Sequence, residues 1–328
     1  MLKLERSIAA LGFCLALLIL TAIPTAVSAA SQVDETEART QAAQTTDAED
    51  GKGARTCLKC HDTPPATLIL HTPHAQAADP RTPFADKECQ SCHGESNAHL
   101  VKPAEGQPRA APDIVFGRQS PTPVEKQNQV CMDCHTGGLR MNWAMSQHSS
   151  GEVSCASCHK PHQIKDKVLV KATQAEICFT CHAEQRAQSL KRSRHPIREG
   201  KVVCSDCHNP HGSFGPKLLV KNTVNETCFQ CHAEKRGPFL WEHAPVADNC
   251  TNCHTPHGSS QPRLLAVRAP FLCQTCHAET FHPSTLYSGV FLPPSTSASA
   301  ARLLAKACLN CHPMVHGTNH PSGARLTR

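Results

Sequence analysis

Apolar residues are unevenly spread along the 328-residue chain. One continuous apolar stretch runs from Ile8 to Ile23, and the rest of the chain carries only short apolar groups between proline-rich connections. No segment shows the regular alternation over about ten residues that is typical of a strand in a membrane β-barrel. The pattern therefore predicts short α-helices and helical turns joined by coil, with little or no sheet.

The apolar stretch near the N-terminus has the features of a secretory signal peptide. Lys3 and Arg6 precede it, and the small residues of Val27-Ser28-Ala29 follow it. It is short for a membrane anchor, which is the alternative, because a spanning helix needs about 20 apolar residues. We expect residues 1–29, including Cys14, to be removed as the protein is exported to the periplasm.

The segment after the signal peptide is polar. Residues 31–56 contain six acidic and three basic residues and no large aromatic residue. Such a composition cannot bury much apolar surface, so it predicts a flexible lead-in over residues 30–56. A docking role for this segment is the alternative.

The composition is poor for an ordinary hydrophobic core. Only 4% of the residues are aromatic, and the 39% hydrophobic share includes the cysteines. Without them the apolar share falls to about a third, below the usual share for a globular domain. Something other than side chains must fill the interior, and 21 cysteines and 22 histidines indicate what it is.

Twenty of the 21 cysteines occur in ten copies of Cys-x-x-Cys-His. Two thiols at this spacing can form thioethers with one haem, and the adjacent imidazole can bind its iron as the proximal ligand. We therefore predict ten covalently attached c-type haems. The predicted thioether residues are Cys57, Cys60, Cys89, Cys92, Cys131, Cys134, Cys155, Cys158, Cys178, Cys181, Cys204, Cys207, Cys228, Cys231, Cys250, Cys253, Cys273, Cys276, Cys308 and Cys311. The predicted proximal iron ligands are His61, His93, His135, His159, His182, His208, His232, His254, His277 and His312.

Other uses of paired cysteines fit this pattern less well. Tetrahedral zinc sites do not need a histidine after every pair. A disulfide framework does not require a uniform two-residue gap. A thioredoxin-like motif occurs singly in a sheet-and-helix pattern, which this chain lacks.

Twelve histidines lie outside the motifs, and ten six-coordinate irons would need ten distal ligands. Three of them follow a motif in His-x-Pro-His, and three precede a motif by seven to nine residues. The candidate distal ligands are His74, His99, His148, His162, His195, His211, His243, His257, His282, His316 and His320. His71, the twelfth, competes with His74 for one position, and His316 competes with His320.

Ligation by two histidines decides the expected class of reaction. It leaves no open position on the iron for a substrate, so it favours electron transfer, and we expect no catalytic residues. Methionine is an alternative distal ligand, but besides Met1 the chain has only Met132, Met141, Met145 and Met314.

The motifs recur every 45 to 50 residues in two interleaved series in the middle of the chain. One repeat therefore carries two haems, and consecutive repeats should extend an elongated row of haems. We divide the chain after the lead-in into an N-terminal half with five haems, residues 57–190, and a C-terminal half with five haems, residues 191–328.

The formal charge of +6 does not indicate a nucleic-acid partner. Each haem carries two propionates, so the haem-loaded protein should be acidic overall and its basic residues should offset these carboxylates. The chain also has few aromatic side chains on which bases could stack.

Several segments resemble one known family. They are Cys204-Ser-Asp-Cys-His-Asn-Pro-His-Gly-Ser213, the segment from Cys231 to Val246 around Trp241, Lys191-Arg-Ser-Arg-His-Pro196, Arg140-Met-Asn-Trp143, and Val315-His-Gly-Thr-Asn-His-Pro-Ser-Gly323. Together they resemble the MtrA/DmsE family of periplasmic decahaem cytochromes, over essentially the whole chain from Cys57. The resemblance implies an outer-membrane β-barrel partner, an extracellular multihaem cytochrome or surface reductase, and a periplasmic or inner-membrane cytochrome as donor or acceptor. It also favours His74 over His71.

These observations predict an electron conduit across the outer membrane. It would serve extracellular electron transfer, as metal-oxide reduction or ferrous iron oxidation, with the protein in the periplasm and bound to the outer membrane through the barrel. The alternative is a free periplasmic multihaem carrier that feeds a terminal reductase. A multihaem reductase is a minor alternative, because all ten motifs are regular.

Overall fold

The computed structural model describes residues 53–277 and 307–327. The predicted signal peptide 1–29, nearly all of the lead-in 30–56 and His282 lie outside these residues. The chain divides after Asp50 into two units, and every described residue belongs to the second, Gly51–Arg328. The division of this unit into halves at residues 57–190 and 191–328 stays a prediction.

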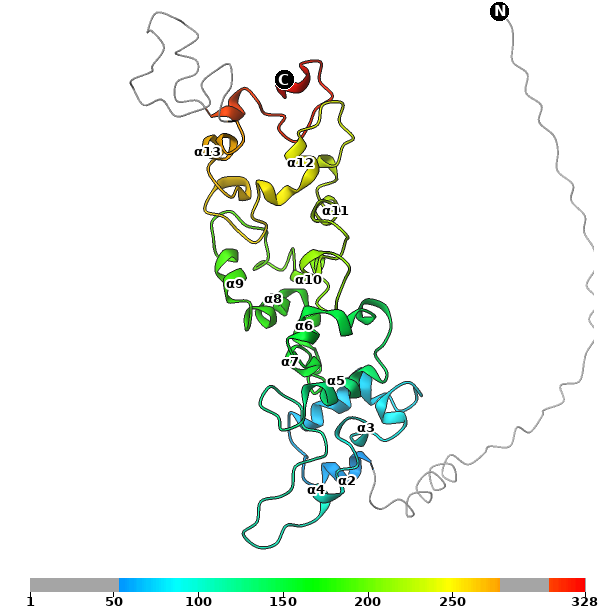
Figure 1. Ribbon diagram of the computed structural model, residues 1–328. Coiled ribbons are helices and arrows are strands. Elements are labelled where there is room, and N and C mark those ends of the chain that lie inside the picture. The colour runs from blue at the N-terminus through cyan, green and yellow to red at the C-terminus, as the bar shows by residue number, and fades with distance from the viewer. Residues whose placement is uncertain (1–52, 278–306, 328) are drawn as a thin grey trace, which may run out of the picture. The chain divides into compact units, whose positions relative to one another are not determined.

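The described chain consists of short helices joined by coil, and within the second unit α2, α3 and α4 lie at one end and α12 and α13 at the other (Figure 1). The longest, α5 and α8, have nine residues each. The α-helices are α2 Ala54–Leu58, α3 Gln90–His93, α4 Asn97–Leu100, α5 Val124–Met132, α6 Gln147–Ser150, α7 Cys155–Cys158, α8 Lys171–Phe179, α9 Ala183–Ser189, α10 Cys204–Cys207, α11 Val224–Phe229, α12 Ala244–Asp248 and α13 Ala269–Gln274.

Short 3₁₀-helices lie between the α-helices and after them. They are η1 Ala66–His71, η2 Pro73–Ala75, η3 Pro83–Ala85, η4 Gly138–Arg140, η5 Trp143–Met145, η6 Lys167–Leu169, η7 Pro216–Leu218, η8 Ala233–Lys235, η9 Cys250–Asn252, η10 Pro262–Leu264, η11 Cys308–Asn310 and η12 Gly323–Arg325. Within residues 53–277 and 307–327 the only β-structure is a set of isolated bridges, among them His208 with Leu219 and His254 with Leu265. The predicted fold class, short helices and coil without sheet, is confirmed.

Each Cys-x-x-Cys-His motif forms one helical turn. The histidine N–H donates a hydrogen bond to the carbonyl of the first cysteine, four residues earlier, over 2.8–3.1 Å in all ten motifs. The odd-numbered motifs begin inside helices of five to nine residues, namely α2, α5, α8, α11 and α13. The even-numbered motifs lie in turns of three or four residues, namely α3, α7, α10, η9 and η11. Each two-motif repeat of the sequence thus corresponds to one longer helix followed by one shorter helical turn.

Few hydrophobic side chains are buried against other protein atoms. In the part of the chain that the structure describes, the buried hydrophobic residues are Ala54, Ala175, Phe179, Val203 and Leu326. Large hydrophobic side chains are more often exposed, and Phe214 is 82% exposed. The protein atoms alone therefore do not form an ordinary core, as the composition predicts.

Close contacts between repeats depend on glycine. In His211-Gly212 and His257-Gly258 the glycine has φ of 109° and 154°, a region that L side chains rarely adopt. A Cβ atom on Gly212 would collide with the carbonyl oxygen of Asn142, and one on Gly258 with the carbonyl oxygen of Gln188. The segment after motif six or motif eight thus packs directly against the backbone of an earlier repeat.

Replacing Gly258 with alanine should destabilise the haem-loaded protein by about 1–3 kcal/mol, because the added methyl group forces the two backbones apart. Gly137→Ala is the matched control, since Gly137 has φ of −93° and no atom within 4 Å of a Cβ built there. Chemical denaturation followed by circular dichroism compares the two variants. Equal denaturation midpoints would contradict the close packing at Gly258.

Candidate functional site

The structure brings the histidines of the motifs together with histidines from outside the motifs. In nine pairs one ring comes from a motif and the other does not, and the ring centres are 6.0–6.2 Å apart. The pairs are His61–His99, His93–His162, His135–His74, His159–His211, His182–His148, His208–His257, His232–His195, His254–His316 and His277–His243. Each histidine belongs to only one of these nine pairs.

This separation fits an iron ion between the two rings. An imidazole nitrogen lies about 2 Å from a first-row metal ion and about 1 Å from its own ring centre, so two imidazoles on opposite sides of one ion have centres about 6 Å apart. A haem offers two such axial positions, one on each side of its plane. The paired histidines therefore fit one haem at each of nine motifs.

The tenth motif is not among the nine motifs whose histidine pairs are described above. His312 donates from Nδ1 to the carbonyl oxygen of Arg325 at 2.5 Å. His282, a candidate distal ligand, lies outside the described residues. The distal ligand at His312 is therefore inferred below from the way the other nine motif histidines are paired.

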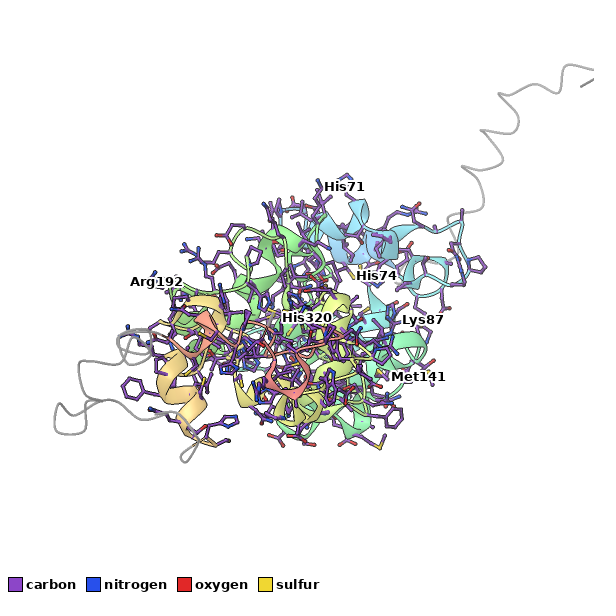
Figure 2. All side chains as sticks on the ribbon, turned by 90° about the horizontal axis from the view of Figure 1, so that it is seen from above. His71, His74, Lys87, Met141, Arg192 and His320 are labelled. Carbon is purple, nitrogen blue, oxygen red and sulfur yellow. The ribbon has the colours of Figure 1, made fainter. Side chains whose placement is uncertain are left out.

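The structure places the two members of each competing histidine pair in different surroundings. His74 is half-buried and pairs with His135, and His316 is half-buried and pairs with His254. His71 and His320 are exposed, and neither takes part in the nine pairs. Figure 2 shows His71 at the outer edge of the described chain and His74 further inside.

Backbone carbonyls orient many of the paired rings through Nδ1. Motif histidines His93, His208 and His254 contact the carbonyl oxygens of Ile114, Lys217 and Arg263 at 2.9–3.0 Å. Distal candidates His99, His148, His195 and His243 contact those of Ala110, Pro210, Pro256 and Val315 at 2.7–3.0 Å. A carbonyl only accepts, so Nδ1 carries the proton and Nε2 is left with a lone pair for a metal ion.

Burial adjusts the charge of several of these rings. It lowers the pKa of His74, His93 and His211, because the charged imidazolium is less well solvated inside the protein. Burial is also the main cause of the lowered pKa of His257 and His316. The neutral imidazole, which is the form that binds metal ions, is thus favoured near pH 7.

The contacts of distal candidates also connect different repeats. Pro210, whose carbonyl accepts from His148, directly precedes His211. In the same way, His195 donates a hydrogen bond to the carbonyl oxygen of Pro256, which precedes His257. His243 donates one to the carbonyl oxygen of Val315, which precedes His316. Each of these contacts joins a segment before one motif to a segment after the motif two further along the chain. The spacing of histidines in the sequence does not show this pairing rule.

Neighbouring motifs are in contact through their cysteine side chains. The first cysteine of an odd motif lies beside the first cysteine of the next even motif; these pairs are Cys57–Cys89, Cys131–Cys155, Cys178–Cys204, Cys228–Cys250 and Cys273–Cys308. The second cysteine of an even motif lies near the second cysteine of the next odd motif; these pairs are Cys92–Cys134, Cys158–Cys181, Cys207–Cys231 and Cys253–Cys276. In each pair the pKa of the first thiol is raised, mainly by burial and further by the neighbouring cysteine.

These contacts join all nine consecutive pairs of motifs in sequence order. The ten motifs therefore form a single series in which each motif adjoins the one before it and the one after it. Buried asparagines strengthen the connections: Asn128 of α5 accepts from the N–H of Cys155, and Asn225 of α11 accepts from the N–H of Cys250. Among the helices of the described residues, none has the length and apolar character to cross a bilayer.

Comparisons with known proteins agree with this geometry. A family model described as a doubled CXXCH motif matches residues 195–237 and 243–282, one for NrfB-like cytochrome c-type proteins matches residues 89–173, and one for cytochrome c554 and c-prime matches residues 23–94. A multiheme cytochrome MtrA from Shewanella baltica is 45% identical over 278 residues, which are 84% of this chain and 82% of the relative. The chain belongs to the MtrA family of multihaem cytochromes. A cytochrome c-type protein NrfB from Haemophilus influenzae is 31% identical over 156 residues, 42% of this chain and 68% of that relative.

Membership of the MtrA family confirms the predicted cofactor, covalently attached c-type haem, and the predicted role in electron transfer. Sequence reasoning also identified the histidines that the structure brings into pairs. It did not identify which histidine faces which motif, and it did not single out Asp166, which contacts the ring of His159 at 2.7 Å.

Proposed function

We propose that this MtrA-family protein carries electrons between the periplasm and the cell exterior, inside an outer-membrane β-barrel partner. The unbroken series of contacts between consecutive motifs is the observation that supports this function best. A bilayer with its headgroups is about 40–45 Å thick, which one or two haems cannot bridge and a row of ten can.

The histidine pairs are proposed as the axial ligands of nine irons, with His282 as the distal ligand at His312. His282 is the candidate that remains when the nine paired histidines and the exposed His71 and His320 are set aside. It lies between motifs nine and ten, next to the end of the series. His99, at the other end, lies between motifs two and three and pairs with motif one.

The protein residues determine what kind of chemistry each site supports. Each bound haem supplies one-electron exchange between its ferric and ferrous states. The two histidines of a pair would hold the iron between them, which would keep substrates and water from the metal. The cysteine turns fix the spacing between neighbouring sites, because each turn is hydrogen-bonded internally and contacts the next. These features favour rapid electron transfer along the series over bond-making chemistry.

The partners follow from the same proposal. A row of haems that crosses a membrane must be shielded from lipid, and the chain has no pattern of barrel strands with which to shield itself. We therefore infer a β-barrel partner around the protein, an extracellular multihaem cytochrome or surface reductase at one end, and a periplasmic or inner-membrane cytochrome at the other. The protein would then reside in the periplasm, held at the outer membrane by the barrel.

Single histidine replacements test the ligand pairs. His74→Ala should open one axial position, so the reduced protein should bind about one carbon monoxide per chain, while His71→Ala should bind none. His316→Ala and His320→Ala form a second matched pair with the same expectation. Carbon monoxide binding is titrated by absorption spectroscopy. Binding by the His71 or His320 variant, with none by its partner variant, would contradict the assignment.

Purification from native membranes followed by reconstitution tests the conduit. The protein should copurify with a barrel protein in a one-to-one ratio. Liposomes that contain this complex should transfer electrons from an external reductant to a redox dye trapped inside, and liposomes with the barrel alone should not. Isolation of the protein as a free compact monomer, together with no transfer into the liposomes, would contradict the proposal.

A further inference from the structure

One histidine pair differs from the others in its hydrogen bonds. His159 Nδ1 contacts Oδ2 of Asp166 at 2.7 Å, whereas the equivalent contacts of His93, His208 and His254 are to backbone carbonyls. Another motif histidine near a carboxylate, His232, lies 3.8 Å from Glu234, which is too far for a hydrogen bond, and both side chains are more than half exposed. His159 thus has a charged hydrogen-bond acceptor that these other sites lack.

The carboxylate of Asp166 is held in place. Its side chain is only 14% exposed, and its second oxygen, Oδ1, accepts from the N–H of Val168 at 3.4 Å at the start of η6. Nearby Lys160 directs its ammonium group to the carbonyl oxygen of Ala156. The negative charge of Asp166 therefore lies against the imidazole in a fixed orientation.

The repeats explain why a side chain replaces a carbonyl here. After His208 and His254, the accepting residues Lys217 and Arg263 have positive φ, 51° and 59°, which turns their carbonyls toward the ring. Both follow a proline, in Pro216-Lys217-Leu218-Leu219 and Pro262-Arg263-Leu264-Leu265. After His159 the corresponding segment is Asp166-Lys167-Val168-Leu169 and arrives one residue earlier. Asp166 stands where the other repeats have proline.

The opposite side of the same site lacks such support. His211 pairs with His159 at 6.0 Å and an interplanar angle of 13°, and its Nδ1 is buried without a hydrogen-bond partner. The ring of Trp143 lies 6.3 Å from it. The fourth site is thus asymmetric, with a carboxylate behind the motif histidine and no acceptor behind the distal candidate.

We propose that Asp166 makes the fourth haem the hardest of the series to reduce. A carboxylate that accepts from Nδ1–H increases electron donation from the imidazole to the iron, which stabilises the ferric state more than a carbonyl does. The step affected is the gain of one electron from a neighbouring haem and its loss to the next, so no other reactant is needed. The proposal rests on the ligand pairs given under Proposed function. Asp166 acts through His159 and is therefore a positioning residue.

Asp166→Asn in the full haem-loaded chain removes the charge but keeps an oxygen that can accept the hydrogen bond. Film voltammetry and spectroscopic redox titration should then show that the most negative of the ten components moves to a more positive potential, while the others stay in place. The low-spin ferric EPR signal of one haem should change with it. Glu234→Gln, which removes the exposed carboxylate near His232, is the control and should shift neither.

Unchanged potentials in Asp166→Asn, or a shift equal to that in Glu234→Gln, would overturn the proposal. A full haem content and the absence of high-spin signal show that the variant has folded. The ligand pairs are tested separately with His211→Ala, which should let the reduced protein bind about one carbon monoxide. No binding by that variant would refute the ligand assignment itself, whereas binding together with unchanged potentials in Asp166→Asn would refute only the role of Asp166.

Discussion

Two imidazoles about 6 Å apart, one from a Cys-x-x-Cys-His turn and one from another part of the chain, form the contact on which the rest of the structure depends. In the middle of the chain the two partners come from different repeats, so each iron bound between them would join segments that are far apart in sequence. His148, for example, contacts the carbonyl of Pro210, 62 residues away, and pairs with His182. Metal binding of this kind couples directly to folding, because the unfolded chain has no preformed site.

This dependence explains how so few buried hydrophobic residues are sufficient. A conventional domain of this size gains its stability from apolar side chains packed together. Here the buried hydrophobic residues of the described chain are mostly small, and large ones such as Phe214 and Met145 are exposed. Covalent haems supply large apolar faces in their place. The glycines after His211 and His257 then allow the repeats to approach closely enough to bring both histidines of a pair together.

Much of this arrangement could be predicted from the sequence. The motif spacing indicated the haem attachment, and the proline-rich connections indicated short helices without sheet. The recurrence of histidines outside the motifs indicated the distal candidates, because a ligand needs only its residue type and a regular place in the repeat. The pairing could not be predicted, since it crosses between repeats and depends on how backbones pack at Gly212 and Gly258. Asp166 was missed because its role arises from a connection that is one residue shorter than in the neighbouring repeats.

The account rests on every haem having two histidine ligands and none having an open position. Near-infrared magnetic circular dichroism of the oxidised, unmodified protein measures this directly, because the energy of the low-spin band depends on the pair of axial ligands. We expect a single class of band, that of histidine on both sides, with an intensity that corresponds to ten haems per chain. A high-spin band, or a band of histidine with methionine, would contradict the account.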